Sequence, residues 1–149
     1  MAADDRMAHG TTTRPPRRLV RSALAILTGM VTVVALSMGA DEAMYAAGVF
    51  PPRAQPMQAP ELFALALAYR CAFGVGGSWV AARLSPAHPM RHAMIVGAIG
   101  LALSVAGALA TRNMGLGPAW YSWGLAASTL PCAWLGGRLA GRGARLSAP

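Results

Sequence analysis

The sequence predicts an all-α integral membrane protein, a four-helix bundle built from two antiparallel helical hairpins. Of its 149 residues, 55% are hydrophobic and only 12% are charged, and the apolar residues stand in long blocks without amphipathic alternation. A soluble domain of this size needs a largely polar surface, which five acids and thirteen arginines cannot supply. The composition therefore favours lipid as the solvent of the outer surface.

Four apolar blocks are long enough to cross a hydrocarbon core of ~30 Å at a helical rise of ~1.5 Å per residue. They cover residues 19–40, 61–84, 93–110 and 118–139. Proline and glycine punctuate the three gaps, which makes each gap a turn between helices. We expect a transmembrane domain over 18–142, between a disordered basic tail at 1–17 and a disordered tail at 143–149.

The first block has some features of a secretory signal, because Arg17, Arg18 and Arg21 stand at its start. The apolar run is longer than the core of a normal signal peptide. In addition, a cut after Ala40 would make Met38 the third residue before the cleavage site, where a small residue is needed. The block is therefore predicted to be an uncleaved first helix.

Arginines are unevenly distributed among the tails and gaps, and this predicts the orientation. They are concentrated before the first block, in the second gap and at the C-terminal end, whereas Asp41, Glu42 and Glu61 lie in or beside the first gap. Cytoplasmic segments of membrane proteins carry an excess of positive charge. Both termini are therefore expected in the cytoplasm, with the chain in the inner membrane as a multi-pass protein.

Small residues recur at steps of three and four in the blocks. Helices in lipid associate through such residues, because lipid provides no hydrophobic drive between them. The clearest stripes are Ala25, Thr28, Thr32, Ala35 and Gly39 in the first block, Gly97, Gly100, Ser104, Gly107 and Thr111 in the third, and Gly124, Ser128, Cys132, Gly136 and Ala140 in the fourth. These stripes are predicted packing faces, and Pro131 is expected to kink or loosen the fourth helix.

No constellation of residues indicates catalysis, a metal site or a cofactor. His88 and His92 are four residues apart, but Pro89 between them argues against a helical turn that would align both as ligands. Cys71 and Cys132 lie inside apolar blocks and are expected to be buried free thiols. The arginines flank apolar blocks, and no nucleic-acid-binding module accompanies them. We expect a protein that is not an enzyme, carries no cofactor and binds no nucleic acid.

Arg70 is the exception within the second block. It lies ~13 Å beyond Glu61 at helical rise, a depth at which an arginine costs about 2.5–3.5 kcal/mol. Its helical neighbours on one face are small, so the side chain is predicted to point into the bundle. Two interpretations stay open: protein groups satisfy Arg70, or it binds an anionic ligand in a shallow outward cavity. The candidate polar cluster, functional or structural, is Arg70, Asp41, Glu42, Glu61, Tyr45 and Tyr69.

The run YRCAFGVGGSWVAARLSPAHPMRHA, residues 69–93, together with the VFPP sequence at 49–52, resembles segments of small hypothetical bacterial membrane proteins. This resemblance implies a bacterial origin and a plan of four spans. No activity is established for such proteins, so the resemblance transfers no functional residue.

These observations favour a non-enzymatic accessory or structural membrane component, in contact with the lipid bilayer and partnered by a second copy or another membrane protein. The alternative is a small oligomeric transporter or channel that handles an anionic solute through Arg70. The chemical identity of any small-molecule ligand stays open at this stage.

Overall fold

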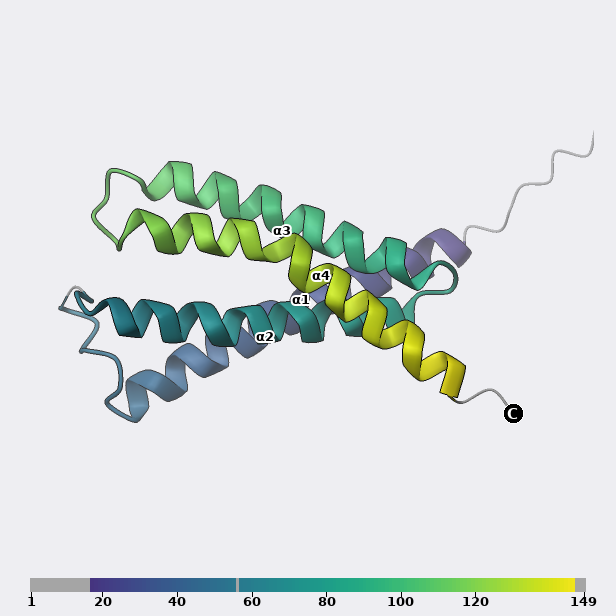
Figure 1. The fold of residues 1–149 in the computed structure, drawn as a ribbon, viewed down its shortest axis with the longest axis horizontal. Coiled ribbons are helices and arrows are strands. Elements are labelled where there is room, and N and C mark those ends of the chain that lie inside the picture. Colours follow the sequence, from purple (N-terminus) through teal and green to yellow (C-terminus); the bar gives the residue numbers. More distant parts are fainter. Residues whose placement is uncertain (1–16, 56, 147–149) are drawn as a thin grey trace, which may run out of the picture.

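The computed structural model describes residues 17–55 and 57–146, with side chains as far as Arg142. It contains four α-helices, α1 (Arg17–Ala46), α2 (Pro60–Leu84), α3 (Pro89–Thr111) and α4 (Ala119–Leu146), and no strand within the described ranges (Figure 1). The predicted all-α class is confirmed.

Three of these helices, α1, α2 and α3, are long and apolar enough to cross a membrane. α4 has 28 residues but is not among them. Its sequence contains three tryptophans, a tyrosine and an internal proline, and it has neither isoleucine nor valine. The four-span plan therefore depends on a helix whose length is sufficient but whose apolar character is weaker.

The helices at both ends of the chain are longer than predicted. α1 continues six residues past Ala40, so that Asp41 and Glu42 are helical. It ends where Gly48 adopts a left-handed backbone (φ +70°), and the N–H groups of Val49 and Phe50 then bond to the carbonyl oxygen of Met44. α4 runs to Leu146, so residues 143–146, which were assigned to the tail, are helical. Residues 1–16 and 147–149 lie outside the described part.

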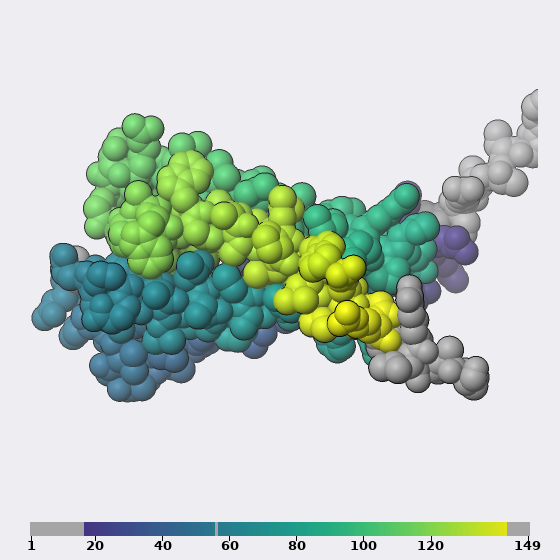
Figure 2. Space-filling model, in the orientation of Figure 1, coloured from purple at the N-terminus to yellow at the C-terminus, as the bar shows by residue number. Residues whose placement is uncertain are grey.

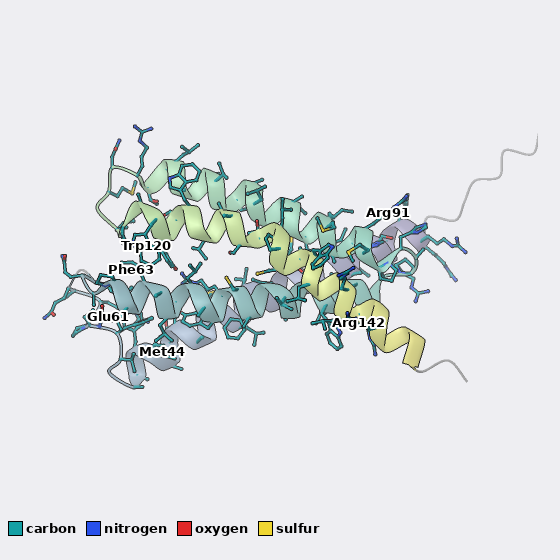
Figure 3. All side chains as sticks on the ribbon, viewed as in Figure 1. Met44, Glu61, Phe63, Arg91, Trp120 and Arg142 are labelled. Atoms are coloured by element: carbon teal, nitrogen blue, oxygen red, sulfur yellow. The ribbon has the colours of Figure 1, made fainter. Side chains whose placement is uncertain are left out.

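The helices are arranged lengthwise, with their connections at two opposite ends (Figure 1). The loops 47–59 and 112–118 lie together at one end, which also holds Glu61, and we call it the acidic end. The loop 85–88 lies at the other end with Arg91 and Arg142 (Figure 3), and we call it the arginine end. α2 packs against all three other helices. α3 also contacts all three others, but its contact with α1 is small, so α2 is the main link between α1 and the rest of the fold.

α4 bends near its middle, where Pro131 interrupts it (Figure 1). Proline has no N–H to donate, and its ring clashes with the preceding turn, so a bend at this position is expected. Beyond it, α4 lies in front of α2 and α3 in the view of Figure 2, and residues 136, 137 and 140 pack against these two helices. Gly136 faces α2, and the adjacent Gly137 faces Met90 and Ala93 of α3. Beyond the bend, the adjacent residues Gly136 and Gly137 therefore lie between α2 and α3.

The interior consists mainly of alanine and glycine, whereas the large apolar side chains lie outside. Ala25, Ala81, Ala93 and Ala133 are at most 1% exposed. By contrast, α1 alone exposes a long row of larger residues: Leu19, Val20, Leu24, Leu27, Val31, Val34, Leu36 and Met38. Helices can approach closely only where side chains are small, so this distribution indicates association through backbone proximity.

α1 and α2 approach each other closely at Gly29 and Gly77. A Cβ atom at either glycine would lie 2.6 Å from the carbonyl oxygen of the other. The predicted α1 stripe was therefore largely wrong: Ala25 is buried, but Thr28, Ala35 and Gly39 are exposed. α1 crosses α2 at an angle (Figure 1), and the face that it turns to α2 carries Ala25, Gly29 and Val33. In α3 and α4, the predicted Gly97, Gly136 and Ala140 are buried, whereas Gly107 is exposed.

Candidate functional site

The Arg70 side chain links three helices near the acidic end. Its Nη2 atom donates to Oδ2 of Asp41 on α1 at 2.6 Å, and its Nη1 atom donates to the hydroxyl of Tyr121 on α4. The hydroxyl of Tyr69, next to Arg70 on α2, donates to the other carboxylate oxygen of Asp41. We call these four residues the Arg70 cluster. Both oxygens of the carboxylate and both terminal nitrogens of the guanidinium have partners in it.

The extension of α1 makes this cluster possible. Asp41 stands five residues before the end of α1, and Tyr121 is two residues past the start of α4. Arg70 is ten residues past the start of α2, or ~15 Å at helical rise. Arg70 reaches its partners through its long side chain, as arginines in apolar segments commonly do.

The guanidinium joins two helices that do not otherwise pack together. Within the described residues, no Cα atom of α1 comes within 8 Å of one of α4. The guanidinium carbon lies 5.8 Å from the ring centre of Tyr69 and 5.9 Å from that of Tyr121, within the usual range of cation–π attraction. Tyr121 also contacts Phe63 of α2, with ring centres 5.2 Å apart. Arg70 and Tyr121 thus connect α4 to the first two helices.

A second group of polar residues lies on the surface beside the first. Arg53, in the loop 47–59, pairs with Glu42, and its guanidinium carbon lies 4.6 Å from the ring centre of Tyr45. Tyr45 in turn contacts Phe50 edge-on. The Glu42 carboxylate raises the pKa of Arg53 above its usual value, first by the hydrogen bond and then by charge. Both charged side chains are about two-thirds exposed, so this pair is a surface ion pair.

The structure divides the predicted polar cluster. Asp41 and Tyr69 join Arg70, whereas Glu42 and Tyr45 belong with Arg53. Glu61 is exposed at the start of α2 and forms no ion pair with the described residues.

Sequence reasoning missed two partners, Tyr121 and Arg53. Tyr121 stands between Trp120 and Trp123, in an aromatic run of the kind that lies at membrane interfaces. Both tryptophans are exposed, but Tyr121 is half-buried. Only the rotation of α4 distinguishes them. Arg53 is the single arginine of a proline-rich loop with acids nearby, and this was the available signal for its ion pair.

The remaining chemically active residues form no catalytic arrangement in the described part of the chain. Buried His92 has its Nδ1 atom 2.8 Å from Oγ of Ser85 and 3.2 Å from the carbonyl oxygen of His88. His88 precedes α3 with a left-handed backbone and is exposed, so the two histidines occupy different environments. Cys71 and Cys132 are free and half-buried. No group of three or more metal-ligating side chains occurs among the described residues.

Comparisons of this chain with protein families, with curated proteins and with solved structures give no match. Inferences about its function therefore depend on its own geometry.

Proposed function

We propose that this chain is a four-span inner-membrane protein of two antiparallel hairpins, with both termini in the cytoplasm and a non-enzymatic accessory or structural role. The charge distribution supports the orientation. Among the residues whose side chains are described, the arginine end carries Arg17, Arg18, Arg21, Arg83, Arg91, Arg138 and Arg142, and no acid. The acidic end carries three arginines and three acids: Arg53, Arg70, Arg112, Asp41, Glu42 and Glu61. The arginine-rich end is the one that the positive-inside rule assigns to the cytoplasm.

The distribution of apolar residues supports insertion. Large apolar side chains cover the outside of the helices, and alanine and glycine fill the contacts between them. In water this arrangement would leave an extended apolar surface uncovered. In lipid it is the expected one, since acyl chains solvate leucine and valine while small residues allow the helices to approach.

The Arg70 cluster is the observation that carries the structural role. An intramembrane arginine is a candidate ligand site when its donors are free. Here both terminal nitrogens of Arg70 are engaged by Asp41 and Tyr121, which lie on two different helices. The most direct role for such a residue is to hold three helices together near the outer face.

The cavity among the four helices gives little support to the anionic-transport alternative. A cavity of about 250 Å³ lies where the four helices meet, and its lining comprises apolar, glycine, serine and threonine residues. Arg70 is not part of its lining, nor is any other charged residue. A path for an anionic solute would need to desolvate the ion in surroundings that provide little compensation.

The topology is testable by cysteine labelling in intact bacterial cells. In a background with Cys71→Ala and Cys132→Ala, the exposed positions Gln55→Cys and Ala87→Cys are treated with a membrane-impermeant maleimide. We expect Gln55→Cys to react in intact cells and Ala87→Cys to react only after permeabilisation. The reverse pattern, or release of the protein from membranes by alkaline carbonate, would contradict the proposed placement.

The accessory role is testable by gentle purification followed by mass spectrometry of whatever co-purifies. A specific membrane-protein partner, retained at a defined stoichiometry, is the expected result. A small anion that co-purifies with the parent protein but not with Arg70→Ala would instead support transport, and so would anion flux in reconstituted vesicles.

A further inference from the structure

We propose that a groove between α3 and α4 at the arginine end binds the headgroup phosphate of an anionic phospholipid. The groove has a volume of about 490 Å³ and is lined by Pro89, Met90, Gly137, Arg138, Gly141 and Arg142. This site rests on the membrane placement proposed above, and nothing in the Arg70 cluster contributes to it. We call it the α3–α4 groove.

Two arginines supply the positive charge of the groove. Arg138 and Arg142 are four residues apart on α4, so they are neighbours on one helical face. The guanidinium carbon of Arg138 lies 4.2 Å from the ring centre of Trp134, which orients its planar fork. Neither arginine forms an ion pair within the described part of the chain, and every described acid lies at the opposite end. The donors of both side chains are therefore available to a phosphate, which arginine binds through its fork geometry.

The backbone leaves room for a headgroup between these side chains. Gly137 and Gly141 contribute no side chain to the groove, and a Cβ atom at Gly141 would meet nothing within 4 Å. α3 begins at Pro89, so the positive end of its helix dipole lies in the same groove and adds to the arginine charge. The groove thus combines two cationic side chains, a helix start and open space.

The surroundings favour a lipid over a free phosphate ion. Trp134, one turn before Arg138 on α4, is exposed and stacks with that arginine, so it provides an apolar surface beside the groove along which an acyl chain can lie. Trp79 and Arg83 of α2 form a second tryptophan–arginine pair at the same end, with 5.3 Å between the guanidinium carbon and the ring centre. Tryptophan concentrates at membrane interfaces, so the two pairs mark the level of the headgroups. Basic pockets between transmembrane helices on the cytoplasmic side are suited to anionic headgroups.

The test uses the purified full chain in detergent and native mass spectrometry, with dioleoylphosphatidylglycerol and dioleoylphosphatidylcholine as probes. We expect one phosphatidylglycerol to bind more tightly than phosphatidylcholine. A basic residue near an anionic lipid contributes an interaction that corresponds to about fivefold in affinity. The double variant Arg138→Gln with Arg142→Gln should therefore lose affinity by roughly 30-fold. Gly141→Leu, which fills the groove and retains the charge, should also weaken binding.

Matched controls distinguish this groove from general basicity. Arg83→Gln removes an arginine from the other tryptophan–arginine pair, and Gly76→Leu adds a side chain where nothing lies within 4 Å on α2. Both should bind phosphatidylglycerol like the parent protein. Equal binding of the two lipids, unchanged binding by Gly141→Leu, or an equal loss in Arg83→Gln would overturn the proposal. Displacement of the lipid by millimolar inorganic phosphate would assign the groove to free phosphate instead.

A separate arm keeps the two proposals distinguishable. Alkaline carbonate extraction of cell membranes reports insertion independently of lipid selectivity. If the chain stays in the membrane pellet but shows no preference for phosphatidylglycerol, only the groove assignment fails. If carbonate releases the chain, the membrane placement fails and the lipid site fails with it.

Discussion

Asp41 and Arg70 form an ion pair between α1 and α2, with Oδ2 of the carboxylate 2.6 Å from Nη2 of the guanidinium. The two side chains are 27% and 29% exposed, so the pair is neither fully buried nor freely solvated. In an apolar environment, each charge would be costly to leave alone. The energetic consequence is that the two residues should behave as one unit.

A double-mutant cycle should reveal this coupling. We expect Arg70→Ala and Asp41→Ala each to destabilise the protein, and the double variant to be less destabilised than the sum by about 1–2 kcal/mol. Each single change leaves one charge without its partner, whereas the double change removes both. Unfolding of the detergent-solubilised protein by a denaturing detergent measures the effect. Additive losses would show that the pair is not coupled.

The exposed ion pair provides the control for that cycle. Arg53 and Glu42 make the same chemical interaction, but their side chains are 64% and 66% exposed. Water and salt screen such pairs, and holding two long side chains in one geometry costs conformational entropy, so the pair adds little to stability. Arg53→Ala should therefore leave the unfolding transition unchanged under the same conditions.

Tyr121 should contribute to stability in two separate ways, through its hydroxyl group and through its ring. Tyr121→Phe removes the acceptor for Arg70 but keeps the ring contact with Phe63, so we expect a loss of about 0.5–1.5 kcal/mol. Tyr121→Ala removes both interactions and should cost more. Tyr45→Phe is the matched control, because the Tyr45 hydroxyl forms no hydrogen bond among the described side chains. Equal effects of Tyr45→Phe and Tyr121→Phe would contradict this assignment.

The adjacent glycines 76 and 77 should respond oppositely to the same substitution. A Cβ atom at Gly77 would lie 2.6 Å from the carbonyl oxygen of Gly29, whereas one at Gly76 would meet nothing within 4 Å. Gly77→Ala should therefore separate α1 from α2 and cost about 1–3 kcal/mol. Gly76→Ala should be neutral or stabilising by up to about 1 kcal/mol, because alanine favours helix more than glycine does. Thermal melts in detergent measure both, and equal shifts would exclude the close approach.

The alanine interior should be intolerant of larger apolar residues. Ala93 is completely buried on α3, and a Cβ atom at Gly137 would lie 3.0 Å from its methyl group. Ala93→Leu should overpack this contact and force the helices apart, which should lower the stability of the protein by about 1–3 kcal/mol. Ala98→Leu, at an exposed position of the same helix, should have little effect. Size-exclusion profiles and melts of the two variants make the comparison, and a well-behaved Ala93→Leu protein would argue against the packing described here.

The sequence identified the elements of the candidate site better than their partners. It placed Arg70 on an inward face with Asp41 and Tyr69 among its candidate partners, and the structure brings these three residues together. It did not include Tyr121 among the candidate residues. It also ended the first apolar block at Ala40, whereas α1 continues to Ala46. The reason is that periodicity reports a helical face relative to its own axis and carries no information on how a neighbouring helix is rotated.

What the sequence by itself determined is the all-helical class, the punctuation between helices and the segregation of arginines from acids, because these follow from local composition and spacing. Only the tertiary structure decided that Gly29 and not Gly39 meets α2, and that Tyr121 closes the Arg70 cluster. Both depend on the angle at which helices cross and on the bend of α4, which are set by the packing of the whole chain.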